Sequence, residues 1–280
     1  MQPLSLDTVA WRTVEGIDFM TWPAFDDLEV DVVMTTRHGG VSTGEYGSLN
    51  LGLHVGDDPE LVIENRRRAA RIIGAGLGDL VFCNQTHGRG VHVVTASERG
   101  SGTTALDTAL SGIDAVVTAD PGPVLAMMVA DCVPIALYAP QAHLAGAVHS
   151  GWRGTVQRVT AATVEAMVAL GAAADEIVAA VGPAVDADHY QVGPEVMEAV
   201  VECFDGETDD LLRPDGDEGS GRYLFDLWEA NRRILVEAGV RADHILLAEV
   251  PTGEDGPFFS HRAAQPCGRN ALLVRLRPST

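Results

Sequence analysis

The chain has 280 residues, a hydrophobic fraction of 46% and a formal net charge of −21. This length is enough to bury a substantial core, and the acidic balance argues against nucleic acid and anionic membranes as partners, because phosphate backbones and headgroups need a basic surface. The sequence contains no lysine, so any phosphate must be held by arginine, histidine or backbone amides.

The cysteine pattern and the N-terminal segment favour an intracellular protein. The four cysteines show no CxxC spacing, and acidic residues interrupt the first 21 residues, which therefore do not resemble a signal peptide. No apolar stretch has the length of a membrane span. We expect a cytoplasmic protein with free thiols, and the sequence leaves its oligomeric state open.

The N-terminal third predicts a hairpin, a strand and a helix. Residues 1–28 mix apolar and acidic side chains as an edge hairpin does, Val30–Thr35 predicts a strand, and 37–46 predicts a glycine-rich loop. A helix over Pro59–Ile73 follows, with Asp58 as its N-cap and proline at its first position. We expect most of its four arginines to form a solvated face.

The middle third predicts three strands and a helix. Leu80–Cys83, Val124–Ala130 and Leu144–Val148 are short uncharged runs, which are typical of buried strands. Segment 98–108, rich in Gly, Ser and Thr, predicts a mobile loop between two strands. Thr155–Leu170 predicts a helix, which makes the Gly-Trp-Arg-Gly segment before it a strand-to-helix turn with free backbone amides.

The C-terminal third predicts two helices and two strands. The helices cover 193–204 and 225–238, and the strands cover 245–250 and 271–276. Residues 205–221 are acidic and Gly-rich, with few apolar residues, and predict an exposed loop.

Strands and helices mix along the chain without strict alternation, and no glycine pattern matches GxGxxG. We therefore expect a single α+β domain over residues 1–280, with mixed β-sheets flanked by helices, rather than a doubly wound sheet with a dinucleotide site.

Two imidazoles and one thiol follow three of the predicted strands. His87, Cys132 and His149 are each compatible with ordinary packing, but together they are the ligand types of an open zinc site. Three protein ligands leave a fourth position for water or substrate, and zinc lowers the pKa of bound water toward neutrality. Zinc is the metal we expect, with copper as the alternative.

Three motifs carry a resemblance to a known family. Gln85-Thr86-His87-Gly88, Ala130-Asp131-Cys132 and His149-Ser150-Gly151-Trp152-Arg153-Gly154 occur in this order. Together they closely resemble the YfiH family, also called the laccase-domain or multicopper polyphenol oxidase family. Further matches occur at 35–42, 49–52, 181–183, 190–193, 226–228 and 258–262. The resemblance extends from about Val32 to the C-terminus.

The resemblance implies a purine nucleoside enzyme. It implies phosphorolysis of adenosine, inosine and methylthioadenosine, deamination of adenosine, and a metal held by His87, Cys132 and His149. Purine nucleosides and phosphate are the implied partners. The chain departs from the family pattern near its end, where His261 replaces a tyrosine and the cysteine-threonine pair expected upstream of it is absent.

Four residues near the motifs are candidates for substrate chemistry. Asp131, beside the thiol, is the candidate proton carrier for deamination, and capping of backbone amides is its alternative role. Arg37 and Arg153 are candidates for phosphate contacts, since arginine is the only strong cation in the chain. Asn50 is a candidate for contact with a purine edge or a ribose hydroxyl, or else a turn residue.

Two other functional classes compete with the nucleoside enzyme. A copper-dependent polyphenol oxidase needs a histidine-rich copper cluster, whereas this chain has nine histidines and no His-x-His pair. A cysteine hydrolase would use Cys132 as nucleophile and His149 as base. Metal content separates the three classes. We expect zinc in the nucleoside enzyme, several coppers in the polyphenol oxidase and no metal in the cysteine hydrolase.

Overall fold

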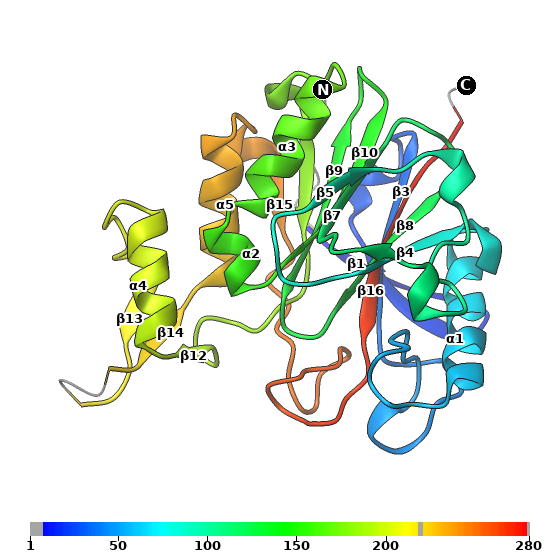
Figure 1. Cartoon of the computed structure of the whole chain (residues 1–280), viewed down its shortest axis with the longest axis horizontal. Helices are drawn as coiled ribbons and strands as arrows, with labels where there is room; N and C mark the ends of the chain where they lie inside the picture. Colours follow the sequence, from blue (N-terminus) through cyan, green and yellow to red (C-terminus); the bar gives the residue numbers. More distant parts are fainter. Residues whose placement is uncertain (1–7, 218–220, 279–280) are drawn as a thin grey trace.

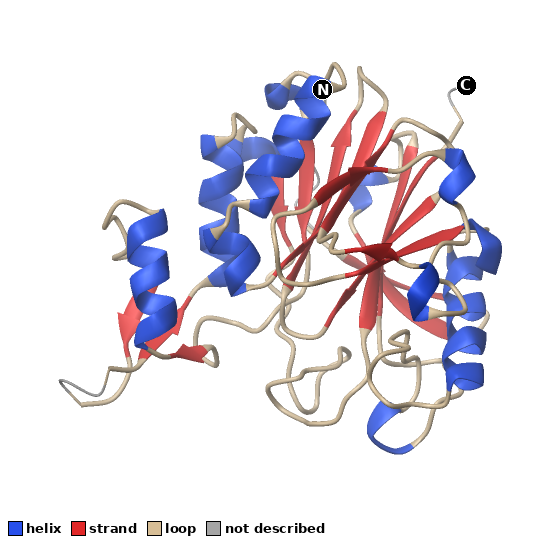
Figure 2. Cartoon of the chain, viewed as in Figure 1, coloured by secondary structure: helices blue, strands red, loops and turns tan. Residues whose placement is uncertain are grey.

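Two large β-sheets pack face to face in the computed structural model, which describes residues 8–217 and 221–278. Helices cover the outer face of each sheet, so the molecule has four layers in the order α, β, β, α (Figures 1 and 2). Both sheets contain parallel and antiparallel pairs. The predicted α+β class with mixed sheets flanked by helices is thereby confirmed.

One sheet has seven strands and carries both ends of the described chain. Its strands are, in spatial order, β1 (Ala10–Val14), β2 (Ile17–Thr21), β3 (Val30–Thr35), β16 (Asn270–Leu276), β8 (Val124–Val129), β4 (Leu80–Asn84) and β6 (Leu110–Ser111). The β1–β2 hairpin lies at the sheet edge as predicted. Residues 1–7 of that prediction lie outside the described residues.

The other sheet has six strands and forms the centre of the molecule. Its strands are, in spatial order, β15 (Ile245–Leu247), β11 (Val178–Val181), β9 (Val133–Ala139), β10 (Leu144–Ser150), β7 (Ala115–Thr118) and β5 (Val91–Val93). Every residue of β9 and β10 is buried, because one face packs on the first sheet and the other on helices. Burial on both faces explains why these strands are apolar runs without alternation.

The helices are distributed over both outer faces. They are α1 (Pro59–Ile72), α2 (Trp152–Val156), α3 (Val159–Ala169), α4 (Pro194–Cys203) and α5 (Leu227–Glu237). α1 packs on the seven-stranded sheet, whereas α3 and α5 cover the six-stranded one. Short 3-10 helices lie in the connections, at Pro23–Phe25, Gly44–Tyr46, Leu77–Asp79, Ala96–Glu98, Leu106–Thr108, Ala174–Glu176 and Ala242–His244. None of the helices in the described ranges has the length and apolar character that crossing a bilayer demands.

Three predicted elements differ in the structure. The helix expected over 155–170 begins earlier, at Trp152, and is broken into α2 and α3 by Arg158, whose φ of 60° lies in the left-handed region. The strand expected over 245–250 ends at Leu247. The acidic loop expected over 205–221 contains β13 (Leu212–Pro214), which joins β12 (Gln191–Val192) and β14 (Tyr223–Phe225) in a small third sheet. Residues 218–220 of the expected loop lie outside the described part of the chain.

The arginines of α1 divide into one buried and three surface residues. Arg66 is fully buried and donates to the carbonyl oxygens of Leu51 (2.8 Å) and Thr103 (3.0 Å), with its guanidinium over the ring of Phe82. The other three pair with glutamates at the surface, as expected of a solvated face. Arg66 is the exception to the majority, and it fastens the loop before β6 to the helix.

Candidate metal centre

The three predicted ligands come from the ends of strands in both sheets. His87 lies in the loop that follows β4 of the seven-stranded sheet, and Cys132 directly precedes β9 of the six-stranded sheet. His149 is the last but one residue of β10, so it lies within a strand rather than beyond it. The link from β8 to β9 crosses from one sheet to the other, and the centre forms at this crossing.

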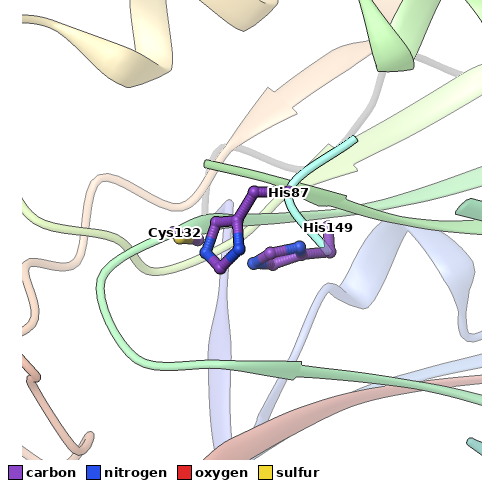
Figure 3. A group of neighbouring side chains, drawn as sticks. All are labelled: His87, Cys132 and His149. Atoms are coloured by element: carbon purple, nitrogen blue, oxygen red, sulfur yellow. The ribbon is translucent and has the colours of Figure 1, made fainter. Parts of the chain in front are cut away.

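The structure brings these three side chains together (Figure 3). One ligand atom from each of His87, Cys132 and His149 lies within 4.8 Å of the others, and the two imidazole rings meet edge to face at 4.8 Å between centroids. Zinc–ligand bonds of about 2.0–2.3 Å place tetrahedral ligands roughly 3.3–3.8 Å apart. A closure of about 1–1.5 Å would therefore let the set surround one ion.

A buried carboxylate orients one of the imidazoles. Asp114, which directly precedes β7, is fully buried and accepts a hydrogen bond from Nδ1 of His149 at 2.8 Å. This bond fixes the tautomer of His149 so that Nε2 faces the centre, which is the carboxylate–histidine arrangement found behind metal ligands. Asp114 could not be predicted from sequence, because 25 residues separate it from the Gln-Thr-His-Gly segment.

The same carboxylate holds the loop that carries His87. Asp114 accepts from the backbone amides of His87 (2.9 Å), Gly88 (2.7 Å) and Thr86 (3.1 Å). Burial alone would raise the pKa of Asp114, but the bonds from His149 and the backbone amides lower it to about 2. Asp114 is therefore ionised and positions two of the three ligands.

The thiol and the buried imidazole stabilise each other's charge. Burial by itself would raise the pKa of Cys132, but the charge and hydrogen bond of His149, with a bond from His87, lower it to about 6. Burial would likewise lower the pKa of His149, but Cys132 and Asp114 raise it to about 9. The thiolate is the form in which cysteine binds metals, whereas His149 must release a proton before its Nε2 can bind one.

Gly151 gives the centre its space. A Cβ atom at this position would lie 2.8 Å from Sγ of Cys132 and 3.1 Å from Cδ2 of His87, closer than side chains tolerate. The segment after β10 therefore approaches the ligands only because this residue has no side chain. The need for glycine here is a property of the site rather than of the turn.

A cavity of about 370 Å³ opens beside the ligands. The further residues that line it are His54, Cys83, Asn84, Gln85, Leu106, Met128, Val129, Ala130, Asp131, Trp152, Arg153, Tyr190, His261, Arg262 and Arg269. Its volume is at the lower end of the range for small-molecule sites. Leu106, Met128 and Val129 form an apolar part, and three arginines supply positive charge.

Two of the predicted substrate residues line this cavity. Asp131 accepts from the hydroxyl of Thr252 and from the backbone amide of Arg262, both at 2.6 Å, which is the capping role given above as its alternative. Arg153 lies over the ring of Trp152, with its guanidinium 3.5 Å from the carboxylate of Glu195.

The other two predicted substrate residues do not line the cavity. Asn50 is fully buried; its side-chain amide donates to Asp57 (2.9 Å), and its oxygen accepts from the backbone amides of Gly52 and Arg269. These bonds make it a turn organiser. Arg37 donates to the carbonyl oxygen of Gly47 and lies over the ring of Phe259. Neither residue lines the cavity, and the substrate contacts expected of Asn50 and Arg37 stay predictions.

Several cavity residues received no role from sequence analysis. Gln85 pairs with the backbone of Met128 in both directions (2.8 and 2.9 Å) and so joins the ends of β4 and β8. Tyr190 and Arg262 belong to segments that were matched to the family but had no chemical signature. Arg269 had no signal at all. They reach the cavity through long-range folding, which spacing does not reveal.

Comparison with known proteins places the chain among relatives of similar length. The family model described as multi-copper polyphenol oxidoreductase laccase matches residues 31–277. The chain is 41% identical over 238 residues to purine nucleoside phosphorylase YlmD of Geobacillus stearothermophilus, which covers 82% of this chain and 83% of that protein. It is 38% identical over 234 residues to adenosine deaminase RL5 of an unknown prokaryotic organism, with coverage of 83% and 88%.

A solved structure supports the same relationship. The hypothetical protein YfiH of Bacillus licheniformis superposes with a TM-score of 0.89 at 33% identity, over 95% of this chain and 99% of that one. Agreement at this level covers both sheets and their helices. The resemblance drawn from the three motifs is therefore confirmed.

Proposed function

The chain belongs to the multi-copper polyphenol oxidoreductase laccase family, and we propose that it is a zinc-dependent enzyme acting on purine nucleosides. The proposed reactions are phosphorolysis of adenosine, inosine and methylthioadenosine, and deamination of adenosine. Relatives of this chain carry the names purine nucleoside phosphorylase and adenosine deaminase. The convergence of His87, Cys132 and His149 at the cavity is the observation that carries the proposal.

The donor set fits a zinc ion. One thiolate and two imidazole nitrogens are ligands that zinc prefers, Asp114 orients one imidazole, and the missing side chain of Gly151 leaves the space. His87, Cys132 and His149 would hold the ion. A zinc ion there supplies Lewis acidity, which makes water a nucleophile near neutral pH.

The cavity supplies contacts of two kinds. Leu106 and Met128 offer an apolar surface for a purine ring, and Arg153 is the substrate contact that we keep from the sequence prediction. Deamination replaces the C6 amino group by oxygen and requires a proton to reach the leaving ammonia. We assign that transfer to Asp131, because this residue lines the cavity beside Cys132.

Product analysis tests the proposal. Purified protein is loaded with zinc, its metal content is measured, and adenosine is supplied with and without inorganic phosphate before chromatography. We expect about one zinc per chain, inosine without phosphate, and free purine base when phosphate is present. Zinc-loaded protein that leaves adenosine unchanged in both conditions would overturn the proposal.

A cysteine hydrolase is a second candidate, and one observation favours it. Cys132, His149 and Asp114 follow one another in the order thiol, imidazole, carboxylate, as in a nucleophile–base–orienter chain. The zinc proposal differs in using His87 as an equal partner. Chelated, metal-free protein separates the two, because a hydrolase would keep its activity and the zinc enzyme would lose it.

A copper-dependent polyphenol oxidase is less well supported. Within the described ranges, one group of three or more His, Cys, Asp or Glu side chains converges tightly enough to hold a metal, and it contains two histidines. Oxygen reduction by multicopper oxidases needs a larger histidine cluster. Several coppers per chain together with phenol oxidation would favour this candidate.

A further inference from the structure

The guanidinium groups of two arginines on the cavity wall form no ion pair with any described carboxylate. Most arginines of this acidic chain lie within 4 Å of a carboxylate, and Arg153 on the same cavity is one of them. Among the described residues, Arg262 and Arg269 form no such ion pair, although both line the cavity. The protein has a net charge of −21, so two guanidinium groups without ion pairs on one cavity make this site unusually positive.

Both guanidinium groups are held in place by neutral partners. Arg262 donates from Nη2 to the carbonyl oxygen of Gln191 at 3.0 Å and lies over the ring of Tyr190. Arg269 donates from Nη1 to the carbonyl oxygens of Cys267 (3.1 Å) and Gly268 (3.0 Å). These bonds orient the groups without neutralising them, and each guanidinium has five N–H donors, most of which remain available.

Two histidines on the same wall add hydrogen-bond donors and carry no charge. Burial and the nearby charge of Arg269 lower the pKa of His54 to about 4, and they also lower the pKa of His261. Both rings are therefore neutral near pH 7, and the positive charge of this wall comes from the arginines. A wall of this kind fits a small multivalent oxyanion.

We infer that Arg262 and Arg269 bind the phosphate that attacks the nucleoside, an inference that rests on the proposed phosphorolysis. One phosphate oxygen forms a bond to C1′ while the C1′–N9 bond breaks. The electron pair of the C1′–N9 bond passes to the purine, which takes up a proton. The products are ribose 1-phosphate and the free base. The two guanidinium forks hold the other phosphate oxygens, and Arg153, shared with Glu195 and 53% exposed, contributes less.

Substitutions at the two arginines separate phosphate binding from the rest of the reaction. Arg262→Gln and Arg269→Gln remove the charge but keep the backbone amides that donate to Asp131 and Asn50, so we expect both variants to fold. The phosphate KM should rise about 10- to 100-fold in each, as expected for loss of a charge-assisted bidentate contact. Adenosine deamination uses water and should fall much less. Lysine variants should lie between.

Controls and a binding assay complete the experiment. Arg241→Gln removes a surface arginine paired with Asp243 and serves as the matched control. Inorganic phosphate should raise the melting temperature of the wild type and of this control, but not of Arg262→Gln or Arg269→Gln. An unchanged phosphate KM and an unchanged phosphate-induced shift in both cavity variants would overturn the inference. So would a rise in phosphate KM confined to Arg153→Gln.

The two levels of failure remain distinct. If wild-type protein forms no phosphate-dependent product, the proposed phosphorolysis fails. The melting experiment then still decides whether the two arginines bind phosphate. If the product forms and the cavity variants bind phosphate normally, the proposed function stands and the assignment of the phosphate site is wrong.

Discussion

Replacing Asp114 by asparagine tests the buried carboxylate that supports the metal centre. The two side chains have nearly the same shape, but asparagine has one acceptor oxygen and one donor NH₂. In the wild type, Oδ1 accepts from His149 and from the amide of His87, and Oδ2 accepts from the amides of Gly88 and Thr86. Asparagine therefore turns its NH₂ toward one of these two pairs of donors.

Each orientation has a calculable cost. If the oxygen keeps His149, the amides of Gly88 and Thr86 face a donor, and two unmatched amides cost about 1–3 kcal/mol each. Both residues are partly exposed, so water recovers part of this and we expect a loss of about 2–3 kcal/mol. If the NH₂ faces Nδ1 of His149 instead, the ring must place its proton on Nε2, which blocks that ligand atom.

The assay measures stability and zinc affinity together. We expect Asp114→Asn to unfold roughly 3–5 °C lower than the wild type and to bind zinc about 10- to 100-fold more weakly against a competing chelator. Asp120→Asn is the matched control, because Asp120 caps the amide of Ala96 beyond the other end of β7. Zinc affinity equal to the wild type in Asp114→Asn would refute the positioning role.

Four further outcomes are expected. Cys132→Ala should lose zinc and at least about 100-fold in turnover while remaining folded, because alanine fits the space; full zinc content with normal turnover would mean that the thiol only packs. Gly151→Ala should lower zinc affinity as its Cβ meets Sγ of Cys132, and an unperturbed zinc titration would contradict the close approach. Asn50→Ala should destabilise the fold by about 2–4 kcal/mol in denaturant titration, with little change in the KM for adenosine; a large KM change with normal stability would support its predicted substrate role. Chelation should abolish both reactions, and one equivalent of zinc should restore them, whereas activity that survives in metal-free protein would favour the hydrolase.

Local sequence signals predicted the elements that depend on local chemistry. The helix of residues 59–72 follows from Asp58, whose side chain accepts from the amide of Glu60, and from proline in its first turn. The strand Val30–Thr35 was predicted with its observed bounds. The central strand Val133–Ala139 carried no prediction, and its proline at position 134 is a residue that ordinarily argues against a sheet interior. Its place between two other strands depends on pairing across the fold.

The site residues also divide into those that local sequence signals predicted and those that depend on long-range folding. His87, Cys132 and His149 were predictable because metal-ligand chemistry restricts residue type strongly, so three such residues at strand ends are a specific signal. Arg269 and Asp114 were not predictable, because their roles depend on which segments the two sheets bring together. Arg37 and Asn50 lie in matched motifs too, and there their side chains form hydrogen bonds within the loops, which residue type alone did not reveal.

The position of Asp114 couples the geometry of the candidate metal centre to the packing of the two sheets. Its backbone oxygen accepts from the amide of His149 within the six-stranded sheet, while its carboxylate holds residues 86–88, which extend from the seven-stranded sheet. One buried anion thus sets the distance between the imidazole of His149 and that of His87. The two sheets fix the ligand frame, whereas residues 261–269 reach the cavity from the loop before β16, and it is there that His261 departs from the family pattern.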